Sequence, residues 1–130
     1  MLRHELILNP RLLALLAGAG HGDIIVVADS GLPIPSTVEV VDLSLSRAVP
    51  SFLQVLDAVQ QTLAIDRALM ATETCDQPLW PELDVHLHGI AVDEMSHEQF
   101  KCRLSSARTI LRSGECTPYA NVGWVAGVTF

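Results

Sequence analysis

Basic residues are scarce in this 130-residue chain, which has 8 Lys and Arg against 15 Asp and Glu and a formal net charge of −7 at pH 7. Because a surface of this sign repels phosphate groups, nucleic acids and anionic membranes are not expected as partners. Long apolar runs are also missing, since the longest, Leu12 to Ala19, is too short to cross a bilayer. Asn9, Pro10 and Arg11 interrupt any apolar region near the start, so no secretory leader is expected.

Cysteine is rare, and no Cys-x-x-Cys pair occurs. The three cysteines, Cys75, Cys102 and Cys116, are odd in number and far apart. We interpret them as free thiols of a cytoplasmic protein, packed as small core residues. A phosphate-binding glycine loop is absent as well, because residues 31–37 (GLPIPST) have neither the lysine nor the glycine spacing of a P-loop. Nothing in the sequence therefore indicates a cofactor.

Hydrophobic residues, by contrast, make up 49% of the chain. That content and the length predict a single domain over residues 1–130 with an ample core. The content is also high for a small monomer, so we expect part of the apolar surface to be shared with other copies of the chain in a homo-oligomer.

Strand-like and helix-like segments alternate along the chain. Strands are expected at Ile24–Ala28, Val38–Val41, Arg67–Thr72, Ile90–Asp93, Thr109–Leu111 and Val122–Val128. Helices are expected from Asn9-Pro10 to Gly18, from Pro50-Ser51 to about Leu63, and from a Ser96/Gln99 capping box to about Leu104. The segment Thr74–Gly89 gives no clear pattern. This order predicts an α/β fold, Rossmann-like, with three layers and a largely parallel sheet flanked by helices.

Polar residues stand at both ends of the expected strand Ile24–Ala28. His21 precedes it and could exchange a proton near neutral pH, or could be a solvated loop histidine. Asp29 follows it and could accept hydrogen bonds from a ligand, or could cap the Gly31/Pro33 turn. Strand ends in α/β sheets are where ligands bind, so both positions are candidates for function.

A second polar group lies in the segment 114–121, GECTPYAN. If Tyr119 to Asn121 is extended, both of those side chains point to the same face, where a phenol and a carboxamide would suit a neutral polyol. The same residues could also form a structural hairpin turn. His97, in the first turn of the expected third helix, could contact a ligand or lie on the surface.

A zinc site is the third possibility, because Asp84, His86 and His88 lie close together in sequence. No HExxH motif and no third histidine accompany them, so we predict that no metal is bound.

The order of short blocks along the chain resembles the ribose pyranase / fucose mutarotase family. The blocks cover nearly the whole length and read ILNPRLL, GHGD, ADSGLPIP, VDLSL, VPSFLQVL, SHEQFK, RSGECTPYAN and the terminal GVTF. PYAN after GEC, and the GVTF ending, favour the ribose branch. The chain departs from the family pattern at Gly22, where threonine is common, at Ser30, where alanine is common, and in the short segment Thr74–Gly89.

The resemblance implies roles for individual residues. His21 falls on the family's catalytic proton donor. The positions that match its substrate-binding residues are Asp29, His97, Tyr119, Ala120 and Asn121. The resemblance implies no metal and no cofactor.

The resemblance also implies an activity and an assembly. The activity is interconversion of the pyranose and furanose forms of D-ribose by acid–base ring opening and closure, and the assembly is a cytoplasmic homodecamer. Other functions stay open: a mutarotase for another sugar such as L-fucose, a non-catalytic sugar-binding module, and a metal-dependent hydrolase using His86 and His88.

The spacing of two candidate residues suggests that the site is shared between chains. His21 and Asp29 lie eight positions apart around one strand, an extended path of roughly 26 Å at about 3.3 Å per residue. Since a monosaccharide is much smaller than this, we expect a neighbouring subunit to supply one of these residues, or to supply Tyr119 and Asn121.

Overall fold

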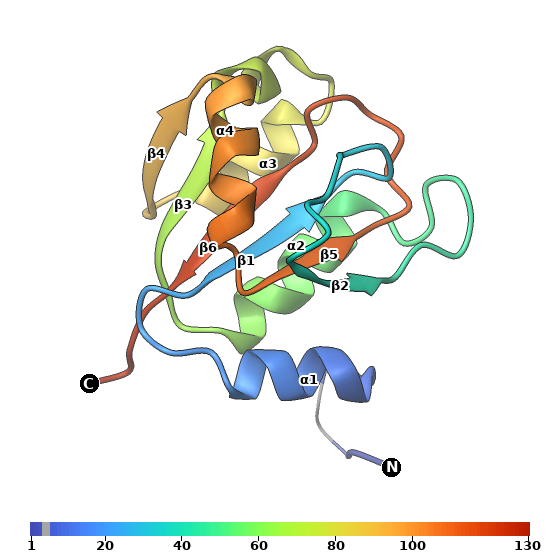
Figure 1. Cartoon of the computed structure of the whole chain (residues 1–130), viewed down its shortest axis with the longest axis vertical. Coiled ribbons are helices and arrows are strands. Elements are labelled where there is room, and N and C mark those ends of the chain that lie inside the picture. The colour runs from blue at the N-terminus through green and yellow to red at the C-terminus, as the bar shows by residue number, and fades with distance from the viewer. Residues whose placement is uncertain (4–5) are drawn as a thin grey trace.

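The structure is a computed structural model that describes residues 1–3 and 6–130 (Figure 1). Its helices are α1 (Pro10–Ala17), α2 (Phe52–Thr62), α3 (Trp80–Leu87) and α4 (His97–Arg103), with short 3₁₀ helices η1 (Thr72–Asp76) and η2 (Leu104–Ser106). Its strands are β1 (Ile24–Ala28), β2 (Glu39–Asp42), β3 (Ile65–Ala71), β4 (Ala91–Met95), β5 (Thr109–Arg112) and β6 (Val122–Ala126). Among the described residues, no helix is long and apolar enough to span a membrane.

The strands form one six-stranded sheet in the order β2-β5-β1-β6-β3-β4. The pairs β2–β5, β5–β1 and β3–β4 are parallel, so the predicted largely parallel α/β sheet is confirmed. Strand β6 is the exception, because it runs antiparallel to both β1 and β3. Residues 113–121, which connect β5 to β6, contain no helix and are too few for the crossover that a parallel return requires.

Helices cover both faces of the sheet, as the three-layer prediction requires. Alternate residues of β1 point to opposite faces, so Ile25 and Val27 join the core beneath α1, α2 and α3. Val26 joins the smaller core on the other face, where Phe100 of α4 is buried. β1 is buried at every position, which explains its uninterrupted apolar sequence.

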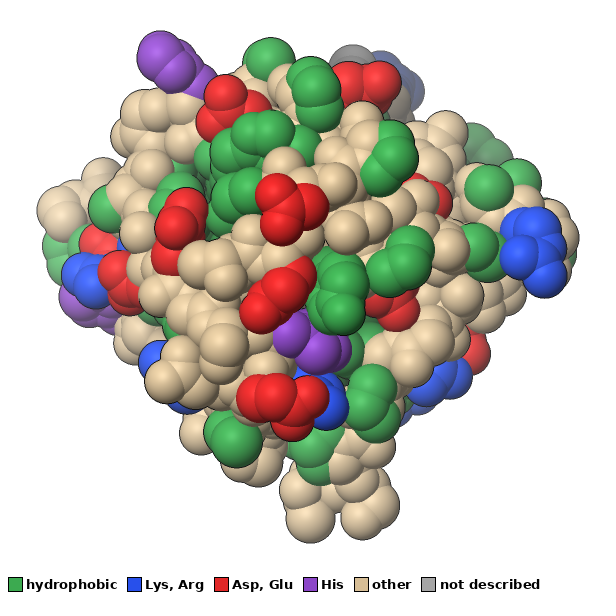
Figure 2. All heavy atoms as spheres, turned by 90° about the horizontal axis from the view of Figure 1, so that it is seen from above, with side chains coloured by type: hydrophobic (Ala, Val, Ile, Leu, Met, Phe, Trp, Pro, Cys, Tyr) green, Lys and Arg blue, Asp and Glu red, His purple; other side chains and the backbone are tan. Residues whose placement is uncertain are grey.

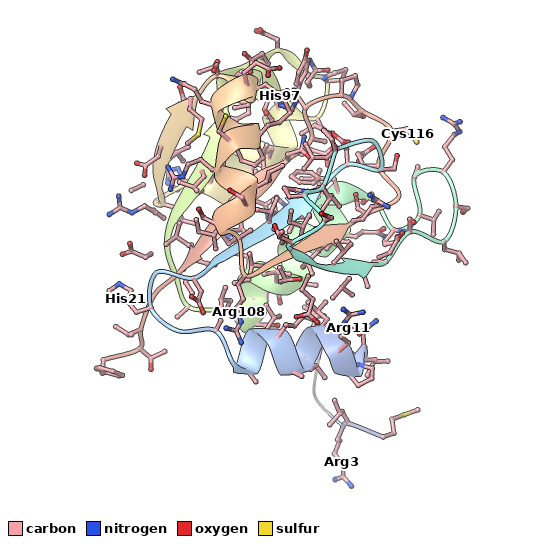
Figure 3. The ribbon with its side chains drawn as sticks, viewed as in Figure 1. Arg3, Arg11, His21, His97, Arg108 and Cys116 are labelled. Carbon is pink, nitrogen blue, oxygen red and sulfur yellow. The ribbon has the colours of Figure 1, made fainter. Side chains whose placement is uncertain are left out.

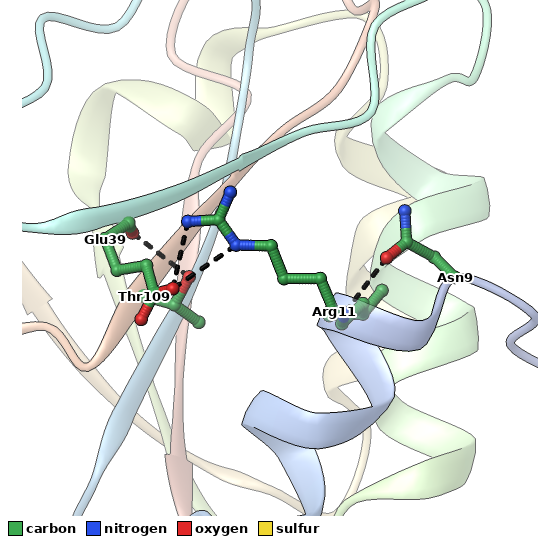
Figure 4. Close-up of polar contacts among 5 residues, drawn as sticks. Asn9, Arg11, Glu39 and Thr109 are labelled. Atoms are coloured by element: carbon green, nitrogen blue, oxygen red, sulfur yellow. Dashed lines mark hydrogen bonds and ion pairs between the residues drawn. The ribbon is translucent and has the colours of Figure 1, made fainter.

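The predicted helix starts are confirmed by their caps. The Asn9 side chain accepts a hydrogen bond from the backbone N–H of Leu12 at 3.0 Å and so begins α1. Arg11 of the same helix contacts Glu39 at 2.9 Å, which ties α1 to the edge strand β2 (Figure 4). A complete capping box at Ser96 begins α4 directly after β4, and His97 is the first residue of this helix.

The segment Thr74–Gly89, for which no element was predicted, contains most of η1 and the whole of α3. Helix α3 begins without a side-chain cap and has Pro81 in its first turn. Because it lacks the Ser, Thr, Asp or Asn that normally signals a helix start, sequence patterning could not locate it.

Candidate active site

A pocket of about 560 Å³ opens where β1 and β5 end. These strands are parallel, so the loops that follow them meet at the same edge of the sheet. The start of α4 and the loop between β2 and α2 complete the walls. The lining residues are Asp29, Ser30, Gly31, Leu32, Pro33, Arg47, His97, Glu115, Cys116, Thr117, Pro118 and Tyr119. Three of the predicted site residues, Asp29, His97 and Tyr119, are therefore brought together.

Asp29 is held in one orientation by its neighbours. Its Oδ1 accepts a hydrogen bond from the backbone N–H of Gly31 at 2.8 Å, and its Oδ2 accepts one from Asn121 Nδ2 at 2.9 Å. Asn121 Oδ1 in turn accepts a bond from the backbone N–H of Asp29 at 3.0 Å. Asn121 is fully buried, so it orients the carboxylate from behind, and Ala120 beside it is fully buried as well.

Tyr119 and His97 form an aromatic wall of the pocket. Their ring centroids lie 4.9 Å apart in an edge-to-face arrangement. Of the two conformations considered for Tyr119 to Asn121, the extended one is not observed, because Tyr119 has a φ of 60° and lies in a turn. That turn directs Tyr119 to the pocket and Asn121 to the interior, where it contacts Asp29.

His21 stands at the opposite end of β1 from this pocket (Figure 3). Asp23 fixes its turn, because Asp23 Oδ2 accepts a hydrogen bond from Gly20 N at 2.9 Å, and Gly22 has a φ of 88° that favours glycine. The His21 side chain is exposed. Five strand residues separate the two ends by about 16 Å, so one chain does not bring His21 and Asp29 to a single small ligand.

Five polar residues of the lining were given no role from the sequence, namely Ser30, Arg47, Glu115, Cys116 and Thr117. Glu115, Cys116 and Thr117 follow β5, and their signal was the density of polar residues in GECTPYAN. Glu115 accepts bonds from the backbone N–H of Phe52 and from the Thr117 hydroxyl, both at 3.3 Å. Arg47 comes from the β2–α2 loop, where nothing in the local sequence marks it as a site residue.

The charge of the pocket favours an uncharged ligand. Two carboxylates, Asp29 and Glu115, line it together with one guanidinium, Arg47. The face seen in Figure 2 has acidic side chains spread over its middle beside a histidine. The carboxylates can accept hydrogen bonds from sugar hydroxyls, and the hydroxyl and imidazole groups of the lining can donate to them or accept from them, whereas a sugar phosphate would meet two like charges.

The RbsD / FucU transport protein family matches residues 1–129 of the chain. This chain belongs to the RbsD / FucU family. The matched range includes the pocket, the Asp29–Asn121 pair and the His21 turn. The family predicted from the sequence blocks is therefore confirmed.

Individual RbsD / FucU relatives support the same placement. The D-ribose pyranase of Geobacillus kaustophilus is 45% identical over 126 residues, which cover 95% of this chain and 93% of the relative. That of Pseudomonas putida is 42% identical over 129 residues, with 95% and 96% covered. Bacillus subtilis RbsD complexed with D-ribose has a TM-score of 0.93 and 36% identity over the whole of both chains. A fucose mutarotase from Streptococcus pneumoniae in complex with L-fucose shares the fold, with a TM-score of 0.77, 24% identity and 94% of each chain covered.

Of the two histidines considered for zinc, His86 contacts helix α2 and His88 is exposed in this RbsD / FucU member. His86 Nδ1 lies 3.2 Å from Gln60 Oε1 and 3.8 Å from Asp57 Oδ1, so it faces α2. Within residues 1–3 and 6–130, no three His, Cys, Asp or Glu side chains are grouped closely enough to hold a metal ion.

Proposed function

We propose that this chain is an intramolecular isomerase that interconverts the pyranose and furanose forms of D-ribose. The observation that carries the proposal is its 45% identity, over nearly its whole length, to a protein named D-ribose pyranase. The pocket supports the proposal, because its carboxylate, imidazole and phenol groups supply hydrogen-bond donors and acceptors for a neutral polyol. The structure of a relative complexed with D-ribose supports the same ligand class.

Ring exchange needs acid–base chemistry only. Opening transfers a proton to the ring oxygen and removes one from the anomeric hydroxyl, while the bond between the anomeric carbon and the ring oxygen breaks. Closure by a different hydroxyl reverses these transfers and forms the other ring. Acid–base help from one positioned side chain accelerates such steps by about 10²–10⁴-fold.

We assign the proton transfer to His21 and sugar binding to Asp29, His97 and Tyr119, with Asn121 and Ala120 behind them. Since His21 lies at the far end of β1 from the pocket, the His21 that acts on a bound sugar belongs to a neighbouring copy of the chain. Its exposure on a turn fixed by Asp23 leaves it accessible to such a neighbour.

The assembly is a cytoplasmic homodecamer that acts on ribose before it is phosphorylated. An apolar groove of about 590 Å³, lined by Leu6, Leu8, Leu45 and Val49 among others, supports self-association. Exposed leucine and valine side chains grouped in this way favour an interface over open solvent.

Saturation-transfer NMR on a panel of aldoses tests the proposal. Irradiating one ring form of D-ribose should reduce the signals of the other forms faster with the protein than without it, and His21→Ala should abolish the effect. Faster exchange of L-fucose than of D-ribose would assign a different sugar. Binding of ribose without accelerated exchange would contradict the proposed isomerase activity and would indicate a non-catalytic sugar-binding module.

A further inference from the structure

Two neighbouring residues of η1 contact the aromatic wall from outside the pocket. Glu73 Oε2 accepts a hydrogen bond from the backbone N–H of His97 at 2.7 Å. The Thr74 hydroxyl donates to the backbone carbonyl of Tyr119 at 2.7 Å. Thr74 is fully buried, so no water competes for its hydroxyl. One short segment therefore touches both residues of the His97–Tyr119 pair.

The conformation of Tyr119 needs such support. Its φ of 60° lies in the left-handed region, which is unfavourable for a residue with a Cβ. Its carbonyl accepts a second bond, from the backbone N–H of Asn121 at 2.9 Å. Two donors on one carbonyl, one of them a buried side chain, hold the turn in an arrangement that the tyrosine would not otherwise prefer.

The same contacts lead to the carboxylate of the site. Asn121, whose backbone shares the Tyr119 carbonyl with Thr74, uses its side chain to orient Asp29 through bonds of 2.9 and 3.0 Å. A change at Thr74 therefore acts directly on Tyr119, and acts on Asp29 through Asn121.

We propose that Thr74 is a positioning residue of the active site, and that Glu73, next to it in η1, positions the start of helix α4. Thr74 fixes the Tyr119 turn, and Glu73 fixes the start of the helix that presents His97. Together they set the angle and separation of the aromatic wall. The effect on catalysis rests on the proposed function, whereas the effect on the Tyr119 turn does not.

The test compares three threonine variants. Thr74→Val keeps the β-branched shape and removes the hydroxyl, whereas Thr74→Ser keeps the hydroxyl. Thr109→Val is the matched control, because Thr109 is also fully buried and its hydroxyl also donates to a backbone carbonyl, that of Glu39 at 3.1 Å (Figure 4). Thr109 begins β5, at the end of the strand away from the pocket.

We expect Thr74→Val to lower kcat/KM for ribose ring exchange by about fivefold to thirtyfold, the loss expected from one buried hydrogen bond. Thr74→Ser should restore most of the activity, and Thr109→Val should stay within about twofold of the unmodified protein. Equal losses in Thr74→Val and Thr109→Val would show a general effect of stability and would overturn the proposal.

A spectroscopic measurement separates positioning from activity. Tyr119 is the single tyrosine of the chain, so tyrosine labelled with ¹³C at its carbonyl and ring gives signals from this residue alone. Thr74→Val should shift both signals in the ligand-free protein, and Glu73→Ala should shift the ring signal through loss of the His97 contact. Unchanged Tyr119 signals in both variants would overturn the proposal even if activity fell. If the unmodified protein does not exchange ribose, the proposed function fails, and the Tyr119 signals still decide whether Thr74 positions the turn.

Discussion

At the scale of single residues, the orientation of Asp29 depends on Asn121. The Asn121 side chain donates to Asp29 Oδ2 at 2.9 Å and accepts from the backbone N–H of Asp29 at 3.0 Å, and both bonds are buried. Asn121→Ala removes both and leaves the Asp29 N–H without a partner, so we predict a loss of about 1–3 kcal/mol in the free energy of unfolding. Ribose binding should also weaken, because the carboxylate then keeps only its bond from the backbone N–H of Gly31.

Tyr119→Phe is the matched comparison, since it removes the hydroxyl of a residue that lines the pocket and leaves the ring in place. It should weaken ribose binding by about 0.5–1.5 kcal/mol and leave stability unchanged. Titration calorimetry with ribose and thermal unfolding measure the two effects. If both variants bind ribose normally while Asn121→Ala unfolds earlier, these residues are structural and the sugar binds elsewhere.

The prediction that all three cysteines are small core residues is wrong, because Cys102 and Cys116 are exposed and Cys75 is half-buried. Burial raises the pKa of the Cys75 thiol, and the nearby carboxylates of Glu94, Asp76 and Asp84 raise it further. A raised pKa leaves less thiolate at a given pH, and the thiolate is the nucleophile. We predict that iodoacetamide modifies Cys75 more slowly at pH 8 than it modifies the exposed Cys102 and Cys116, as followed by peptide mass spectrometry.

The control for this prediction is alkylation in denaturant, where the three thiols should react at similar rates. Cys75 reacting first in the folded protein would contradict the account of its surroundings.

The position of Asp29 at the sheet edge could be predicted from the sequence, but the backbone conformation of Tyr119 could not. Asp29 could be placed because a fully buried strand is recognisable and its end is at a sheet edge. The geometry of Tyr119 could not, because a left-handed tyrosine is rare and depends on a bond from Thr74, 45 positions away. Whether Asn121 faces a ligand or another side chain depends on that same turn.

At the scale of elements, the β2–α2 loop is held against the β5–β6 loop by a close backbone approach at Gly114. A Cβ at this position would lie 2.5 Å from the Ser46 carbonyl oxygen and 2.6 Å from that of Val49. Gly114→Ala must therefore displace the loop that carries Arg47 to the pocket. We predict a loss of about 1–3 kcal/mol in stability and weaker ribose binding.

Gly20→Ala is the control for stability, because its Cβ would meet nothing closer than Asp23 Oδ2 at 3.9 Å. Its midpoint of chemical unfolding should change little. A Gly114→Ala variant as stable as Gly20→Ala would mean that the two loops separate easily, and that Arg47 is not held over the pocket.

The elements that could be predicted are those with a strong local signal. The caps at Asn9 and Ser96 and the apolar run of β1 are properties of a few consecutive residues. Helix α3 was not predicted because it has no capping residue at its start. The antiparallel direction of β6 follows from the short connection 113–121 and not from any pattern within the strand itself.

At the scale of the whole molecule, the proposed assembly concerns two surfaces of the chain. One is the apolar groove around Leu45 and Val49, and the other is the pocket, which lies at the far end of β1 from the chain's own His21. In the proposed assembly, the His21 turn of one chain reaches the pocket of a neighbouring chain. A closed symmetric assembly repeats this contact at every subunit.

Complementation between two variants that are each impaired in ribose exchange tests the shared site. One chain carries His21→Ala and keeps an intact pocket, and the other carries Asn121→Ala and keeps its His21. When the two are dissociated, mixed in equal amounts and reassembled, about a quarter of the sites combine an intact pocket with an intact His21 if assembly is random and heterologous. Ribose exchange should recover to roughly that fraction of the unmodified rate. Each variant reassembled alone is the control, and native mass spectrometry must show mixed oligomers. Mixed oligomers without recovered exchange would mean that His21 does not act on the pocket of a neighbouring chain.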